Sequence, residues 1–530
     1  MFDLLIKDGI IADGSGDKAY KADLAVLNGK IAEIAPQINA PARRVVDAKG
    51  KLVTPGFIDI HRHADVNLFM PSFGEAELRQ GLTTIVNGNC GLSCVPCPDK
   101  YREEILSFLR PVIGETPRDK QFETFGEYMQ LVDKTPLPLN VGMCVGNGTV
   151  RAATRGYAKG KLTDSELITA RAHLRDALEC GALGVTLGIV YAPEYNYDAD
   201  DFVQVLQPMQ EYSVPLVTHI RGEGDLFHKS LYEVIDIAKR LSVPLHISHF
   251  KCIGKRNWRH GAIHALEILN EARAEGLQVD CDVYPYTAGS TQLIQILPPE
   301  YLEGGTAQIV KRLQSPVCRE ELRRIFSAPS DSFENLVNSI GWENIRCTSM
   351  FCAENQQYLG KSVAEIAAIR SEDPCDTACA LLASEECNIS MVDFITSEDD
   401  VRRILASPLS SVISDSVYPT GGVPHPRLYG AFPKVLIDYV REEQLLPIEM
   451  AIHKMTAKPA AVYKLANKGL LKVGYDADIN VFALSNLCAP ASYENPKQFA
   501  SGFDYIFVKG ILALEHDCLT HAPVGELLRR

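Results

Sequence analysis

The chain has 530 residues, 46% hydrophobic and 23% charged, a composition typical of a globular protein with more than one core. Its 67 acidic and 53 basic residues give a net charge of −14, which argues against nucleic acid or an anionic membrane as a partner. The first residues lack the features of a signal peptide, and no run reaches the roughly 18 apolar residues of a membrane helix. We therefore expect a cytoplasmic protein whose 15 cysteines are reduced.

The two ends of the chain share one pattern. Residues 1–54 alternate and turn like small antiparallel strands, and the tail does the same around residues 474–482 and 505–510. We expect these ends to pair into one small β-sandwich domain, made of residues 1–54 and 464–530.

A short apolar run from Gly56 to Ile60 leads directly into His61 and His63. Side chains two residues apart on a strand point to the same side, so both imidazoles can reach a single metal ion. An isolated pair of this kind also fits a surface strand without a metal. The residues that follow decide between these two interpretations.

Short apolar, β-branched runs alternate with helical patterns through the middle of the chain, as they do in parallel βα proteins. Eight such runs predict a (β/α)8 TIM-like barrel built from residues 55–286 and 410–463. The predicted strands are Gly56–Ile60, Thr83–Asn89, Asn140–Gly146, Gly184–Val190, Pro215–Ile220, Pro244–Phe250, Gln278–Tyr286 and Ser410–Ser416.

The roughly 120 residues between the seventh and eighth predicted strands are too many for a simple βα connection. Within them Arg346–Met350 and Ser390–Ile395 resemble strands, and Pro374–Ser384 resembles a helix. We expect an inserted α/β subdomain or lid over residues 287–409.

Polar side chains gather where the predicted strands end, which is where a barrel of this kind carries its chemistry. The residues at these ends are His61, His63, Cys90, His219, His249 and Asp415. Imidazole, thiolate and carboxylate together suit zinc, which activates water and polarises a carbonyl. A carboxylate such as Asp415 can accept the proton of that water and pass it to a leaving amine. The set therefore predicts hydrolysis of an amide.

Several motifs resemble those of one family. Residues 55–63 (PGFIDIHRH) look like the signature of the amidohydrolase superfamily. Further segments resemble the N-acyl-D-amino-acid deacylase (D-aminoacylase) family within it: 80–91 (QGLTTIVNGNCG), 181–184 (GALG), 191–193 (YAP), 247–251 (ISHFK), 284–290 (YPYTAGS), 425–430 (HPRLYG) and 454–460 (KMTAKPA). The resemblance implies zinc-dependent hydrolysis of N-acyl-D-amino acids, a small-molecule substrate, to a carboxylate and a free D-amino acid.

The same resemblance implies a role for each matching residue. One zinc would be held tightly by Cys90, His219 and His249, and a second, weaker zinc by His61 and His63 with Cys90 between the two. Asp415 would be the catalytic acid and base. Cys90 stands where many amidohydrolases outside this family have a carboxylated lysine, which points away from hydantoinases and dihydroorotases.

The resemblance also implies residues that hold the α-carboxylate of the substrate, namely Lys251, Tyr191 and a tyrosine of the seventh-strand motif. A cation and phenol hydroxyls suit a carboxylate. Tyr284 and Tyr286 lie on the same side of a strand, so the sequence leaves this choice open. The loop after Asp415 is where we expect variation within the family.

Three different functions fit only part of the sequence. The spacing of Cys90, Cys94 and Cys97 is also that of iron–sulfur radical enzymes, but such an enzyme would leave the histidines and Asp415 unused. A hydantoinase-like or isoaspartyl-dipeptidase-like amidohydrolase would act on a cyclic or dipeptide amide. A barrel without catalytic activity would be expected to have lost ligands, and none is missing here.

The remaining polar residues near the motifs have smaller expected roles. Asp65 and His425 are predicted to support the site rather than react, while Arg221 and Glu223 either orient the site or pair with each other. The other histidines are predicted to be surface or packing residues: His173, His228, His246, His260, His264, His453, His516 and His521.

Overall fold

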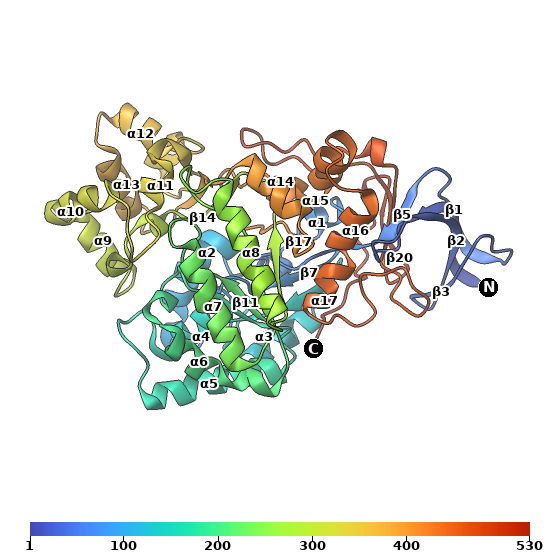
Figure 1. Cartoon of the computed structure of the whole chain (residues 1–530), viewed down its shortest axis with the longest axis horizontal. Helices are drawn as coiled ribbons and strands as arrows, with labels where there is room; N and C mark the ends of the chain where they lie inside the picture. Colours follow the sequence, from blue (N-terminus) through green and yellow to red (C-terminus); the bar gives the residue numbers. More distant parts are fainter.

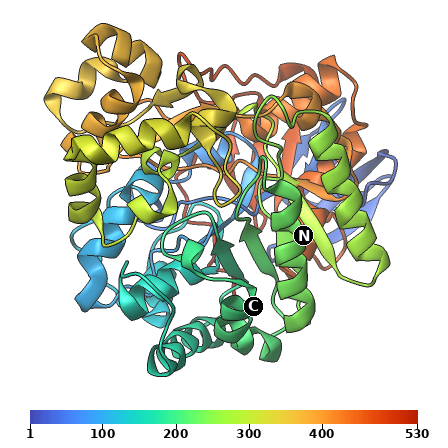
Figure 2. The same ribbon diagram turned by 60° about the vertical axis from the view of Figure 1, so that its left-hand side comes forward.

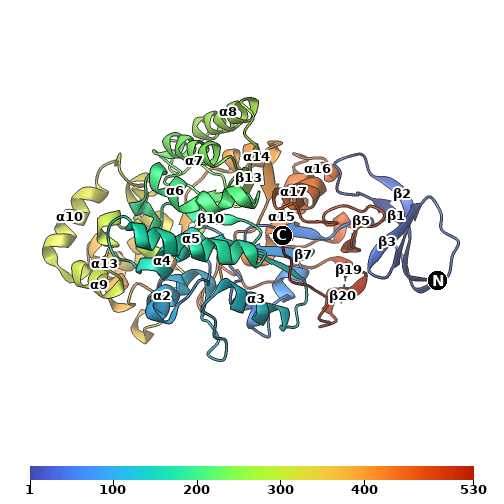
Figure 3. The ribbon, with the colours of Figure 1, turned by 90° about the horizontal axis from the view of Figure 1, so that it is seen from below.

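The computed structural model describes all 530 residues, and it has a central barrel between two smaller regions (Figure 1). The sheet made by the chain ends lies at one end of the molecule, and the segment inserted after the seventh barrel strand lies at the other (Figure 3). None of the helices is long and apolar enough to cross a membrane.

The predicted (β/α)8 barrel is present. Its parallel strands are β6 (Phe57–Asp59), β7 (Leu82–Asn87), the interrupted pair β8 (Asn140–Met143) and β9 (Val145–Gly146), β10 (Val185–Gly188), β11 (Leu216–His219), β12 (Leu245–Ile247), β13 (Val279–Val283) and β17 (Ser410–Val412). They are fully buried, apart from one half-buried residue in β13, because helices cover the barrel on the outside.

Two short bridges close the barrel. Cys144, between β8 and β9, donates its backbone N–H to the carbonyl of Asn87 (2.9 Å) and so connects the two halves of the third strand to β7. On the other side, the backbone N–H of Asp415 donates to the carbonyl of His61 (3.0 Å), just beyond β17 and β6. The last bond places Asp415 directly beside the predicted histidine pair.

Helices pack around the barrel (Figure 2). They are α1 (Glu75–Leu78), α2 (Arg102–Ile113), α3 (Phe125–Asp133), α4 (Asn147–Arg155), α5 (Asp164–Glu179), α6 (Ala199–Leu206), α7 (Phe227–Leu241), α8 (His260–Ala274), α14 (Glu398–Ala406), α15 (Arg427–Lys434) with a π-helical continuation (Val435–Glu442), α16 (Ile448–Met455) and α17 (Ala457–Val462). Local sequence determines where they begin. Thr163 before α5, for example, accepts a hydrogen bond from the backbone N–H of Glu166, as a good N-cap does.

The insertion holds a three-stranded antiparallel sheet in the order β14–β16–β15. Its elements are β14 (Ala288–Gln292), α9 (Thr306–Gln314), α10 (Pro316–Phe326), α11 (Leu336–Ile340), β15 (Ile345–Cys347), α12 (Val363–Arg370), α13 (Pro374–Ser384) and β16 (Ser390–Phe394). Helix α14 falls inside the predicted insertion 287–409, but it packs on α8, β13 and β17. It therefore takes the place of the barrel helix between the seventh and eighth strands.

The two chain ends form one nine-stranded sheet that folds around its own core of 15 buried residues. The strands are β1 (Phe2–Ile11), β2 (Tyr20–Leu27), β3 (Lys30–Ala35), β4 (Ala42–Asp47), β5 (Leu52–Pro55), β18 (Ile479–Phe482), β19 (Phe503–Val508), β20 (Ile511–Glu515) and β21 (Cys518–Leu519). The antiparallel pair of β5 and β18 joins the ends. The residue boundaries predicted for the three domains stay predictions.

Candidate metal centre

The barrel brings the predicted ligands to one end. His61 and His63 follow β6, Cys90 follows β7, His219 is the last residue of β11, and His249 comes two residues after β12. All five are buried. Because parallel strands end at the same rim of the barrel, side chains that are far apart in the sequence converge there.

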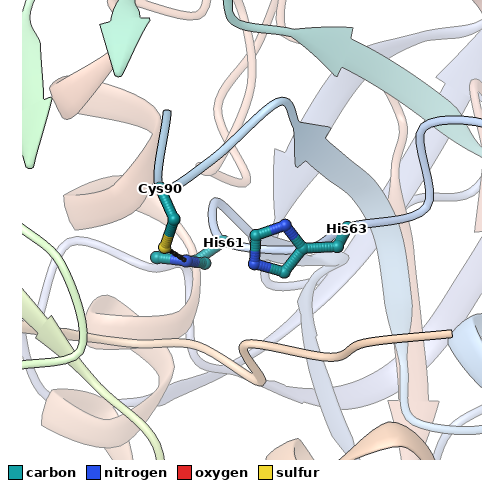
Figure 4. Close-up of side chains that lie close together, drawn as sticks. All are labelled: His61, His63 and Cys90. Atoms are coloured by element: carbon teal, nitrogen blue, oxygen red, sulfur yellow. Dashed lines mark hydrogen bonds between the residues drawn. The ribbon is translucent and has the colours of Figure 1, made fainter. Parts of the chain in front are cut away.

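Two overlapping groups of side chains are placed to hold metal ions. In one, donor atoms of Cys90, His219 and His249 lie within 4.8 Å of one another. In the other, donor atoms of His61, His63 and Cys90 do the same (Figure 4). The Sγ of Cys90 lies 3.2 Å from Nε2 of His61 and 3.5 Å from Nε2 of His249, so one thiol faces both groups.

The donor set fits zinc. Although burial alone would raise the pKa of the Cys90 thiol, the His61 and His249 imidazoles hold it well below its usual value. This environment favours the thiolate, which is the form that binds metals. One thiolate with two imidazoles is a three-residue zinc set that leaves a coordination position for a reactant.

Asp415 lies at the edge of both groups. Its Oδ1 is 3.5 Å from Nε2 of His61 and 3.5 Å from Nε2 of His63, and its Oδ2 is 2.9 Å from Nη1 of the buried Arg427. Burial opposes ionisation, but Arg427 and His61 outweigh it and hold the pKa of Asp415 well below its ordinary value. The residue is a carboxylate that faces the ligands. Arg427 belongs to the HPRLYG segment, yet nothing in the sequence pattern places it against Asp415.

A second buried carboxylate supports the ligands from β13. Asp282 Oδ2 is 2.9 Å from Nε2 of His246 and 3.6 Å from Nδ1 of His61, and Oδ1 accepts the backbone N–H of His249. Despite burial, His246 and His61 keep the pKa of Asp282 below its usual range. His246, predicted as a surface or packing residue, is thus a buried hydrogen-bond partner of this carboxylate. The alternation of residues 278–286 could have indicated Asp282, because it shares the barrel-facing parity of Tyr284.

Arg221 and Glu223 do not pair with each other. Arg221 pairs with Glu233 (2.8 Å), away from the ligands. Glu223 Oε1 accepts from Nζ of Lys251 (2.7 Å) and lies 3.0 Å from Nδ1 of His249, so of these two residues only Glu223 contacts the ligands. Burial opposes ionisation of Glu223, but Lys251 and His219 outweigh it and lower the pKa to about 2.

A cavity opens above the ligands. Tyr191, Lys251 and Tyr284 line it, as does Asp415. Tyr286 does not line it: the ring packs on His425, with centroids 5.0 Å apart. Of the two tyrosines that strand parity left open, Tyr284 is thus the one that lines the cavity.

Residues of the insertion form much of the opposite wall of this cavity, including Thr291, Gln295, Glu334, Leu336, Met391 and Asp393. The insertion thus reaches the space directly above the ligands. This is the geometry of a wall that contacts whatever binds there.

Several predicted residues lie outside both ligand groups. Asp65 accepts the backbone N–H of Cys94 (3.1 Å), and His425 Nε2 is 3.0 Å from the carbonyl of Ala288, so both hold loops. Cys94 and Cys97 join no cluster of three potential ligands. Burial raises the pKa of the Cys97 thiol to about 11 and that of Cys94 well above its usual value. Both thiols are buried and lie outside the two ligand groups.

Comparison with known proteins assigns the chain to a family. A model of the amidohydrolase family matches residues 44–108 and 356–499. The chain is 32% identical to a D-aminoacylase of Alcaligenes xylosoxydans xylosoxydans, over all of this chain and 98% of that one, and 32% identical to an N-acyl-D-glutamate deacylase of the same organism, over all of this chain and 96% of that one. The crystal structure of N-acyl-D-glutamate deacylase from Bordetella bronchiseptica, complexed with zinc and a phosphonate mimic of the tetrahedral intermediate, matches all of both chains with a TM-score of 0.84 at 30% identity.

A parallel barrel with this ring of donor side chains defines the chain as an amidohydrolase, an enzyme that acts on amide bonds. Because the chain is 32% identical to these deacylases over its full length, it can be assigned to one family within the amidohydrolase superfamily. The chain belongs to the N-acyl-D-amino-acid deacylase (D-aminoacylase) family.

Proposed function

We propose that this enzyme hydrolyses the amide bond of N-acyl-D-amino acids with zinc, releasing a carboxylate and the free D-amino acid. The observation that carries the proposal is the meeting of Cys90, His219 and His249 with the carboxylate of Asp415 at one rim of the barrel. The full-length relatives, named for the deacylation of D-amino acids, support the substrate class.

Cys90, His219 and His249 would hold the tight zinc, and His61 and His63 with Cys90 a weaker second one. When bound, zinc supplies a Lewis acid that polarises the amide carbonyl and makes water a better nucleophile. The protein fixes the donors in advance. Asp282 and Glu223 hold ligand histidines from behind, which sets ring orientation and raises ligand basicity.

Asp415 would move the proton. Its carboxylate takes a proton from the attacking water and delivers it to the nitrogen of the amide as the C–N bond breaks. The ion pair with Arg427 keeps the group ionised before the reaction. Water thus supplies an oxygen to the acyl carbon and both of its protons to the amide nitrogen, so that the products are a carboxylate and a protonated amino group and atoms and charges balance.

Lys251, Tyr191 and Tyr284 would hold the α-carboxylate of the substrate. All three line the cavity, and the hydroxyl of Tyr284 is buried without a hydrogen-bond partner. In the structure Lys251 donates a hydrogen bond to Glu223. Its ammonium has further donors, so it can also make a charge-assisted bond to the substrate carboxylate from the same position. A carboxylate bound at this point places the neighbouring amide over the ligands.

The insertion would act as the specificity wall of the site. Its residues line the cavity opposite the barrel, and loops at the carboxyl ends of barrel strands commonly determine what such enzymes bind. A cytoplasmic location and a small-molecule substrate remain part of the proposal.

The proposal is tested with zinc-loaded enzyme and a panel of N-acetyl-D- and N-acetyl-L-amino acids. We expect release of free amino acid from D substrates and little from their L counterparts. Hydrolysis of L substrates alone, or of cyclic amides and dipeptides alone, would contradict the substrate class. Iron and acid-labile sulfide without zinc in the purified protein would contradict the metal.

A further inference from the structure

The insertion contributes two carboxylates to the active-site cavity that no mechanistic step uses. Asp393 lies on β16, opposite Gly289 of β14, and Glu334 lies just before α11. Both line the same cavity as the proposed ligands and Lys251. No motif in the sequence includes either residue.

Asp393 is buried without a partner. The residue is 4% exposed, and its Oδ1 has no hydrogen bond in the structure. Burial raises the pKa of Asp393 to about 6, although Lys251 and Arg427 act against it. A buried carboxylate oxygen without a hydrogen bond costs free energy. A ligand that donates a hydrogen bond to this oxygen removes that cost, which favours its binding.

Glu334 is the second carboxylate without a cationic partner. Its Oε2 accepts the backbone N–H of Gly224 (2.7 Å), and the side chain takes part in no ion pair. Burial raises its pKa to about 7. Glu334 also borders a neighbouring hollow that includes Glu300, so it stands where the cavity continues away from the ligands.

The rest of the cavity lining suits a substrate side chain that is long, apolar along its stem and cationic at its end. The same lining includes the apolar side chains of Leu336, Met391 and Ile395. Lys251 is the sole lysine or arginine that lines the cavity, and the α-carboxylate would occupy it. An acidic substrate side chain would therefore meet two carboxylates and no free cation, whereas a long basic side chain has an apolar stem and a cationic head.

We propose that Glu334 and Asp393 form a subsite for the cationic head of a basic side chain, so that the preferred substrates are N-acyl derivatives of D-lysine or D-arginine. The inference rests on the proposed function and names the side chain that this site selects. The apolar stem would lie along Leu336, Met391 and Ile395, and the cation would pair with the carboxylates.

The decisive comparison uses N-acetyl-D-lysine and N-acetyl-D-norleucine, which share the same carbon chain and differ by the terminal ammonium. With the zinc-loaded full-length enzyme we expect kcat/KM to favour lysine by about 10- to 100-fold, the range of a charge-assisted hydrogen bond. N-acetyl-D-glutamate should be the poorest of the three. Norleucine equal to or better than lysine, or a preference for glutamate, would overturn the inference.

Variants locate the effect. Glu334→Gln should reduce the lysine-to-norleucine ratio by about tenfold or more, and Asp393→Asn should do the same. Glu300→Gln is the matched control, because Glu300 is an exposed carboxylate that borders only the neighbouring hollow, and its ratio should stay that of the wild type. A ratio that neither Glu334→Gln nor Asp393→Asn changes would contradict the subsite, and Glu334→Gln suffices if Asp393→Asn fails to fold.

The results that would refute the subsite differ from those that would refute the proposed function. Hydrolysis of norleucine and other neutral D substrates, without preference for lysine, would refute the subsite alone. If no N-acyl-D-amino acid is hydrolysed, the proposed function fails, and binding still tests the subsite. In that case N-acetyl-D-lysine should bind Asp415→Asn about tenfold tighter or more than N-acetyl-D-norleucine, and equal affinities would refute the inference.

Discussion

The barrel rim and the insertion give the same cavity two kinds of carboxylate. On the barrel side Asp415 pairs with Arg427 at 2.9 Å and Glu223 with Lys251 at 2.7 Å. On the insertion side Asp393 and Glu334 have no such partner. Their pKa values move in opposite directions, because a nearby cation favours the charged form, whereas burial without one disfavours it.

This difference separates two tasks. The barrel side keeps fixed charges on the groups that we propose hold metal and move protons, so their charge state is set before substrate arrives. The carboxylates on the insertion side, Asp393 and Glu334, have no cationic partner, so a bound ligand can supply one. We infer that the reaction is a property of the barrel and that the choice of side chain is a property of the insertion.

The largest expected effect comes from the one thiol that the two ligand groups share. Cys90→Ala should remove most of the zinc and nearly all turnover, because it deletes a ligand from both groups at once. Cys94→Ala is the control, since this buried thiol follows in the same loop and lies outside both groups. Metal analysis and activity of the two variants test the prediction, and full zinc content in Cys90→Ala would refute it.

Lys251→Ala should lower kcat/KM by about 10- to 100-fold, because a charge-assisted bond to the α-carboxylate is lost. Zinc should remain, as Lys251 is not among the clustered ligands. The exposed Lys255 provides the control variant Lys255→Ala. Steady-state kinetics with zinc content measured on the same samples separates the two effects, and loss of zinc without loss of substrate affinity would reassign Lys251 to the metal site.

Asp282→Asn should weaken zinc binding by about 10- to 100-fold, the usual effect of removing a carboxylate behind a ligand histidine. Asp280→Asn, on the same strand, changes a carboxylate that pairs with Lys458 outside the site and should leave zinc affinity unchanged. Competition with a zinc chelator measures both. Equal affinities for the two variants would show that Asp282 does not position the ligands.

The smallest effect concerns stability and pH. The pKa of Glu334 is raised from 4.5 to about 7 in the folded protein, so the protonated carboxyl stabilises the fold below its unfolded pKa, and this contribution is lost as pH rises through 7. Relative to Glu334→Gln, the wild type should lose up to about 3 kcal/mol between pH 4.5 and 8. Melting temperatures of both proteins across this range test it, and a constant difference would mean that Glu334 has a cationic partner.

The architecture could be predicted largely from the sequence because each barrel strand has a recognisable pattern. Runs such as Ile247 to Lys251 or Gly56 to His63 combine a buried apolar strand with a reactive residue at its end, and the βα order determines which ends meet. Helix α13 spans the predicted residues Pro374–Ser384, and it begins at a proline preceded by Asp373, which accepts the backbone N–H groups of Cys375 and Asp376.

What could not be predicted depends on contacts between segments far apart in sequence. Arg427 reaches Asp415, His246 reaches Asp282 across neighbouring strands, and Asp393 enters the cavity from the insertion. Strand parity alone could not separate Tyr284 from Tyr286. The chain turns after β13, and the second ring packs on His425.

The central claim, that the barrel rim does the chemistry with Asp415 as its proton carrier, is tested most directly by Asp415→Asn. Its kcat on an N-acetyl-D-amino acid and its zinc content should be measured on one sample. We predict that the tight zinc is retained and that kcat falls by ~10²–10⁴-fold, with the upper end expected because proton acceptor and donor are lost together. Turnover near the wild-type rate with zinc in place would contradict the claim.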